Sequence, residues 1–198
     1  MMKKNRAYKL AIRAVLIAII LVQSMTPFLG FIPLGLVNVT IIHLTVIVAA
    51  IVLGPGDGAL VGLIWGIGTM IRAYTAPTSP LDTMVFTNPI IAVLPRILVG
   101  YLAGVVYRQT KNKLQAKTLR MALAAGIGSL TNTLVVLGLM RLLFASAMAS
   151  AYKVTSGALN AVIMTIVATN GIPELIAAVI IVPMICLAIF RANKFLDN

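Results

Sequence analysis

Arg96 is the residue whose setting points most directly to chemistry, because it stands inside an apolar run where a charge is costly. It comes about eight residues into the run that begins at residue 88, roughly 12 Å along a helix. A guanidinium keeps its charge and matches a carboxylate with two parallel hydrogen bonds. Arg96 is therefore a candidate contact for an anionic ligand. Two other interpretations stay open: it pairs with Glu174, or it caps backbone carbonyls. Pro95 in the same run leaves the carbonyl of Ile91 without its usual donor.

Three further polar side chains lie within or beside apolar runs. Asn132 is in the middle of one run, in the segment SLTNT, and its amide offers donors and an acceptor to a ligand hydroxyl or amide. The alternative is a hydrogen bond between helices, worth less than ~2 kcal/mol. Asn170 and Glu174 stand at the outer entrance to the last run, where they bind or gate a ligand or cap the helix. Together with Arg96, these residues are the candidate substrate-binding set.

Catalytic and metal chemistry find little support in the remaining residues. His43 has no Cys, Asp or Glu at ligand spacing around it, so we expect no metal site and interpret it as a packing histidine. The chain has no Walker A motif, and Ser129 lacks the Gly-x-Ser-x-Gly order of a serine hydrolase. We therefore expect neither enzyme activity nor a cofactor. An intramembrane hydrolase that uses Ser129 is kept as a third hypothesis, which Ser129→Ala would test.

The composition identifies the elements that must position these side chains. Of 198 residues, 61% are hydrophobic and 10% are charged, and the mean hydropathy is +1.06. A soluble domain is about a quarter charged, so this chain belongs in a membrane. One cysteine excludes a disulfide framework. The net charge of +12 does not indicate nucleic-acid binding, because the cations stand at the ends of apolar runs, where they set topology and contact anionic lipid.

The apolar runs predict an all-α integral membrane protein with six transmembrane helices in a single membrane domain. At about 20 residues a pass, the predicted spans cover residues 10–28, 36–53, 59–73, 88–107, 121–144 and 173–190. The segment GPGDG at 54–58 predicts a tight turn. The apolar stretch 158–168 is too short to cross, so it predicts a re-entrant or interfacial helix before the last span.

The distribution of cations predicts the orientation. With the N-terminus inside, 12 of the 16 Lys and Arg residues fall at inner ends of the spans. The positive-inside rule is then satisfied with both termini cytoplasmic.

Small residues form regular stripes on two parts of the chain. Glycines at four-residue spacing in 58–66 and 100–104 predict close packing between helices. The first span carries a stripe of four alanines, for which internal packing and docking of a partner protein both stay open: Ala7, Ala11, Ala14 and Ala18.

Four segments in order resemble the substrate-binding S component of energy-coupling factor (ECF) vitamin transporters. They are LGPGDGALVGLIWG, NPIIAVLPRILVGYLAGVVYR, GSLTNTLVVLGL and NGIPELIAAVIIVPMI, and the similarity extends over about residues 7–192. The pantothenate-type branch is the nearest match. Its neighbours handle riboflavin, hydroxymethylpyrimidine and pyridoxine, and these ligands stay as alternatives.

The resemblance implies a multi-pass protein of the bacterial cell membrane that captures a vitamin from outside and has no ATPase activity. Its partners would be an EcfT-like membrane scaffold and two cytoplasmic ATPase subunits. The family's alanine motif docks on the scaffold; here it matches Ala14 and Ala18, with Ala7 and Ala11 as a second candidate. The family's ligand would lie among Arg96, Asn132, Asn170 and Glu174. A self-contained carrier or channel is the alternative from another class.

Overall fold

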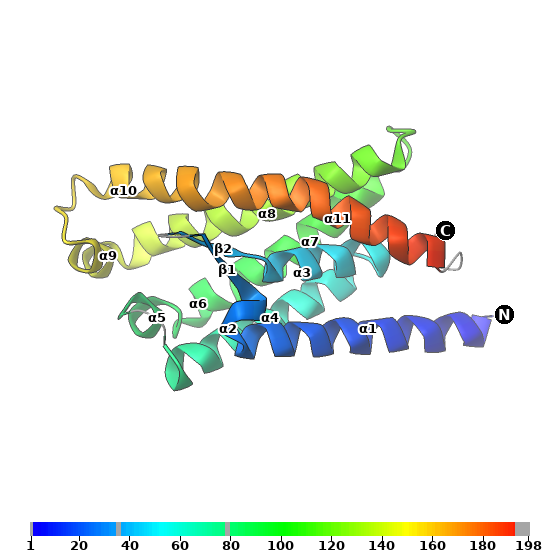
Figure 1. The fold of residues 1–198 in the computed structure, drawn as a ribbon, viewed down its shortest axis with the longest axis horizontal. Helices are drawn as coiled ribbons and strands as arrows, with labels where there is room; N and C mark the ends of the chain where they lie inside the picture. The colour runs from blue at the N-terminus through cyan, green and yellow to red at the C-terminus, as the bar shows by residue number, and fades with distance from the viewer. Residues whose placement is uncertain (1, 35–36, 78–79, 193–198) are drawn as a thin grey trace.

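The computed structural model describes residues 2–34, 37–77 and 80–192 as a bundle of helices with one small hairpin (Figure 1). Within these residues, four helical stretches are long and apolar enough to cross a membrane: Ala7–Met25, Pro89–Gln109, Lys117–Leu143 and Leu159–Ala192. The expected all-α membrane class is therefore confirmed, apart from a short antiparallel pair of strands, β1 (Phe31–Leu34) and β2 (Val37–Thr40).

In the described chain, five long helices and a shorter central one form the body of the bundle, and short helical segments lie between them. The long helices are α1 (Met2–Met25), α4 (Pro55–Thr75), α7 (Leu94–Gln109), α8 (Lys117–Leu143) and α11 (Ile172–Ala192). The central helix is α3 (Ile42–Val52). The others are α2 (Pro27–Gly30), α5 (Pro80–Val85), α6 (Pro89–Ala92), α9 (Ala145–Tyr152), α10 (Leu159–Ile166) and the π-helical turn η1 (Val167–Gly171).

The helix α3 is the centre of the core. All of its residues are buried except Thr45, which is half-buried. It packs on α1, α4, α7, α8 and α11. A helix that is apolar on all sides is the kind that other helices surround. Both chain ends and the α7–α8 link lie at one end of the bundle, and α5 and α9 lie at the other (Figure 1).

The predicted helical span at 36–53 begins too early, because residues 37–41 are not helical. The helix covers only Ile42–Val52, about 16 Å, and the residues before it form β2. The sequence VNVT alternates apolar and polar residues after a glycine, which is a strand pattern. Residues 35 and 36 lie outside the described part of the chain.

Two other boundary predictions also need correction. The predicted turn at 54–58 is confined to Gly54, whose φ is 117°, and α4 begins directly at Pro55, a favoured first-turn position. The predicted separate helix at 158–168 is continuous with the last helix, because α10 passes through η1 into α11. The π-turn contains one residue more than an α-helical turn, and the helix continues through it past Asn170, Gly171 and Pro173 without a break.

The glycine stripes bring α4 and α7 into backbone contact, as predicted. A Cβ on Gly62 would collide with the carbonyl of Arg96, and one on Gly100 would collide with the carbonyl of Gly58. Close approach of two helices requires small residues at such positions. This contact between α4 and α7 fixes the position of α7 along the bundle axis, and with it the position of Arg96.

We expect Gly62→Ala to destabilise the purified protein strongly, because the new methyl group would force α4 and α7 apart. Its unfolding midpoint in detergent should fall by several degrees or more. Gly138→Ala is the matched control, since nothing lies within 4 Å of a Cβ at that position. Equal midpoints for the two variants would contradict the packing described here.

Candidate ligand-binding site

Arg96 is buried at the start of α7, with 6% of the residue exposed. Its Nη1 donates a hydrogen bond of 2.7 Å to the carbonyl of Ile91. That carbonyl lacks a helical donor because Pro95 has no N–H. Arg96 therefore caps a backbone carbonyl, which was one of the alternatives left open by the sequence.

Two aromatic rings lie against the guanidinium group of Arg96. Its central carbon is 4.9 Å from the centroid of the Trp65 ring and 5.3 Å from that of Phe86. Such cation–π contacts hold an arginine in place while leaving its N–H edge available. The Nε atom is buried and has no hydrogen-bond partner among the described residues. The group therefore keeps hydrogen-bonding capacity beyond the Ile91 carbonyl.

Glu174 is also buried but is not paired with Arg96. The ion pairs among the described residues are Arg13–Asp57 and Arg72–Asp82. Instead, the Glu174 Oε1 accepts a 2.8 Å hydrogen bond from the backbone N–H of Thr40, at the end of β2. Arg96 and Glu174 still interact electrostatically. The acid thus ties the hairpin to α11, and the helix-cap interpretation is wrong because α11 has no free start there.

Asn132 and Asn170 lie on elements that pack together, α8 and η1. Next to them, a Cβ on Gly171 would come within 2.9 Å of Thr133 Cγ2. The Asn132 Oδ1 is buried without a hydrogen-bond partner in the described chain. The Asn170 Oδ1 accepts from the Thr169 hydroxyl at 2.9 Å. Asn170 is half-buried within the π-turn.

The hairpin connects these residues into one region. The strand β2 contacts both η1 and α11, and α11 packs on α8. Arg96 from α7 and Glu174 from α11 are within electrostatic range of each other. The region thus offers a cation with spare N–H groups and neutral amides, a set suited to a small organic anion with polar groups.

Two residues of this region were not recognised as site residues from the sequence. The first is Trp65, whose ring lies against the guanidinium group of Arg96. Thr40 carried no signal, because its contribution is a backbone N–H. No group of three His, Cys, Asp or Glu side chains able to hold a metal occurs in the part of the chain that the structure describes.

The alanine stripe lies on the exposed side of α1. All four alanines are exposed, whereas Leu16 and Ile20 on the other side of the helix are buried. The ion pair between Arg13 and Asp57 fastens that inner side to α4. The described part of the chain therefore leaves the stripe largely uncovered.

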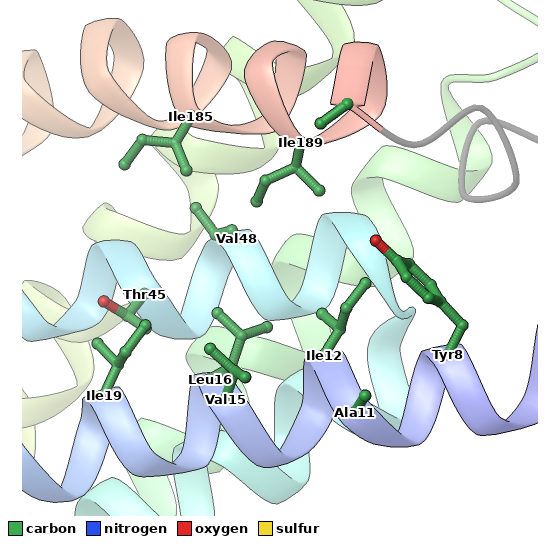
Figure 2. A pocket seen from close by; sticks show the side chains of 11 residues that line it. Tyr8, Ala11, Ile12, Val15, Leu16, Ile19, Thr45, Val48, Ile185 and Ile189 are labelled. Carbon is green, nitrogen blue, oxygen red and sulfur yellow. The ribbon is translucent and has the colours of Figure 1, made fainter.

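An apolar groove of about 620 Å³ runs beside the stripe, between α1, α3 and α11. Figure 2 shows isoleucines of α1 and α11 facing each other across it. Among the described residues that line the groove, only Tyr8 and Thr45 have polar side-chain atoms. Ala11 belongs both to the stripe and to the groove, so the two form one continuous apolar surface.

Residues 8–186 match the family model described as ECF transporter, substrate-specific component. The chain therefore belongs to this family of membrane transport subunits.

Two named proteins are similar to the chain over nearly its whole length. The chain is 36% identical over 190 residues to the pantothenate transporter PanT of Leuconostoc mesenteroides subsp. mesenteroides, with 93% of each chain covered. It is 38% identical over 206 residues to the pantothenic acid transporter PanT of Lactococcus lactis subsp. cremoris, with 98% of this chain and 99% of the relative covered.

Proposed function

We propose that this chain is the membrane subunit that captures pantothenate for an ECF-type transporter. The observation that carries the proposal is Arg96: a buried cation with aromatic rings beside it, spare N–H groups and no salt bridge to a carboxylate among the described residues. A buried charge of this kind is costly unless a partner arrives to balance it. The choice of pantothenate as the ligand rests on the names of the two relatives, which are pantothenate transporters.

Pantothenate fits the candidate site by its functional groups. It carries a carboxylate, an amide and hydroxyls. The carboxylate would bind Arg96, and the amide or a hydroxyl would bind Asn132, with Asn170 at the edge of the site. Glu174 would otherwise repel an anion, but its carboxylate is turned to the Thr40 N–H and stabilises the hairpin. The assignment of Arg96, Asn132 and Asn170 to ligand contact is part of this proposal, and Glu174 is assigned to holding the hairpin beside the ligand.

The identity of the ligand can be tested by mass spectrometry of small molecules that copurify with the detergent-solubilised chain. We expect pantothenate to be enriched over a mock purification. Enrichment of riboflavin, hydroxymethylpyrimidine or pyridoxine instead would support the alternative vitamins.

We also propose six passes with both termini in the cytoplasm. Both ends lie at one end of the bundle (Figure 1), as an even number of passes requires, and most cations gather at the predicted inner ends. In this arrangement α3 makes the second pass together with the hairpin, since it is too short to cross alone. Cysteines introduced near residue 5 and residue 114 should both resist a membrane-impermeant thiol reagent added to whole cells. Labelling of either from outside would contradict this topology.

The partners would be an EcfT-like scaffold in the membrane and two cytoplasmic ATPases, since the chain has no nucleotide-binding motif of its own. The exposed alanine stripe and the apolar groove beside it are the proposed docking surface. The chain itself would carry out no chemical reaction. An autonomous carrier, by contrast, would give pantothenate flux into liposomes that contain this chain alone.

A further inference from the structure

A second group of polar atoms is buried at the hairpin end of the bundle core. Both ring nitrogens of His43, the hydroxyl of Ser129 and the Oδ1 of Asn132 have no hydrogen-bond partner among the described residues. His43 and Ser129 are each only 1% exposed. Buried polar groups in native proteins nearly always have a partner, which is the protein, a water or a ligand. Three such groups on two adjacent helices call for a shared explanation.

The direction of Ser129 and Asn132 follows from the contacts of α8. At Gly128 this helix faces α3, since a Cβ there would lie 2.8 Å from Ile47 Cδ1. At Gly126 it faces α11, since a Cβ there would lie 3.7 Å from Leu175 Cδ1. At 100° per residue, Ser129 and Asn132 fall on the strip between these two sides. That strip faces the interior of the bundle.

His43 lies opposite the same strip. It is one turn before Ile47 and on the same side of α3. The helices α3 and α8 run in opposite directions (Figure 1). From the contact between Ile47 and Gly128, one helical turn toward the hairpin therefore leads to His43 on α3 and to Asn132 on α8.

Thr40 connects His43 to the candidate ligand-binding site. The backbone of Thr40 interacts with the His43 ring, although not in hydrogen-bond geometry. The N–H of the same residue donates to Glu174. Thr40 thus lies between His43 and the Glu174 carboxylate, which ties the hairpin to α11. His43 therefore belongs to the same region as Arg96.

We propose that His43, together with Ser129 and Asn132, forms the uncharged half of the ligand site. A neutral imidazole has one donor and one acceptor, and a serine hydroxyl can act as either. This half would bind the hydroxyl and amide groups of the ligand while Arg96 binds its carboxylate. The inference rests on the proposed function and adds to it a residue on α3 that the sequence had assigned to packing.

The test is calorimetric titration of the detergent-solubilised full chain with two ligands, pantothenate and its alcohol analogue, in which a hydroxymethyl group replaces the carboxylate. His43→Leu should weaken binding of both ligands by a similar factor, about ten-fold, because both keep the amide and the hydroxyls. His43→Gln, which keeps a donor and an acceptor, should recover part of the loss. Arg96→Gln should instead weaken pantothenate binding far more than binding of the analogue.

A matched pair of serine variants covers the case in which His43→Leu does not fold. Ser129→Ala should lower the affinity for both ligands several-fold. Ser24→Ala removes a hydroxyl that is equally buried and unpartnered but packs on Gly68, away from the strip, and it should leave both affinities unchanged. Wild-type affinity in His43→Gln and Ser129→Ala together, or equal losses in the two serine variants, would overturn the proposal. Failure of the wild-type chain to bind pantothenate would overturn the proposed function as well.

Discussion

Arg96→Gln is expected to reduce pantothenate binding by the purified chain on the order of 100-fold or more. Removing one partner of a buried, hydrogen-bonded charge pair costs about 2–5 kcal/mol, and the ligand carboxylate would lose that partner. Glutamine is chosen because it removes the charge but keeps an uncharged N–H donor at about the position of the Arg96 Nε. The protein should therefore stay folded, and equilibrium titration measures the loss.

Two further variants separate charge from geometry. Arg96→Lys should bind at an intermediate level, since it restores the charge but not the two parallel hydrogen bonds. Arg141→Gln is the control, because this cation contacts Asn160 near the start of α10 and none of the four candidate residues. Unchanged affinity in Arg96→Gln with the fold intact would contradict the carboxylate role, and equal losses in the control would show that net charge alone matters.

Ala14→Leu or Ala18→Leu is expected to abolish vitamin uptake by the complete transporter while leaving ligand binding to this chain unchanged. Both alanines are exposed on α1, and a leucine there would hold a docking helix away from the stripe. Neither residue is part of the candidate ligand-binding site. Uptake in cells and copurification of the scaffold measure docking, and titration measures binding.

Ala188→Leu provides the matched control for the stripe. Ala188 is exposed on α11 and continues the face of Ile180 and Met184, which do not line the groove. It should support normal uptake. Normal scaffold copurification in both stripe variants would show that the docking surface lies elsewhere, and a parallel loss of ligand binding would show that the leucines disturb the fold.

The long-range architecture could be predicted because its signals are strong and redundant. Runs of about 20 apolar residues predicted the helices that became α1, α7 and α8, and the positions of Gly62 and Gly100 predicted the close contact of α4 and α7. Arg96 stood out from the sequence because a charge in an apolar run is rare and costly. Carbonyl capping by Arg96 was one of the alternatives left open, and the structure shows that the capped carbonyl is that of Ile91, whose usual donor Pro95 removes.

Other features depend on contacts that a linear pattern does not contain. The hairpin was hidden in an apolar run, and only its alternating period distinguishes it from a helix. The π-turn at Asn170 keeps the last helix continuous through a proline and a glycine that ordinarily indicate a break. The hydrogen bond of Glu174 was not among the alternatives drawn from the sequence, because its partner, the N–H of Thr40, is 134 residues away. The roles of Trp65 and His43 likewise depend on which helices become neighbours.

The central claim is that this chain alone recognises pantothenate, and titration of the purified wild-type protein tests it most directly. We expect saturable, one-to-one binding of pantothenate, with no comparable binding of riboflavin, pyridoxine or hydroxymethylpyrimidine under the same conditions. Binding of any of those vitamins in preference to pantothenate, or no saturable binding by a protein shown to be folded, would contradict the account.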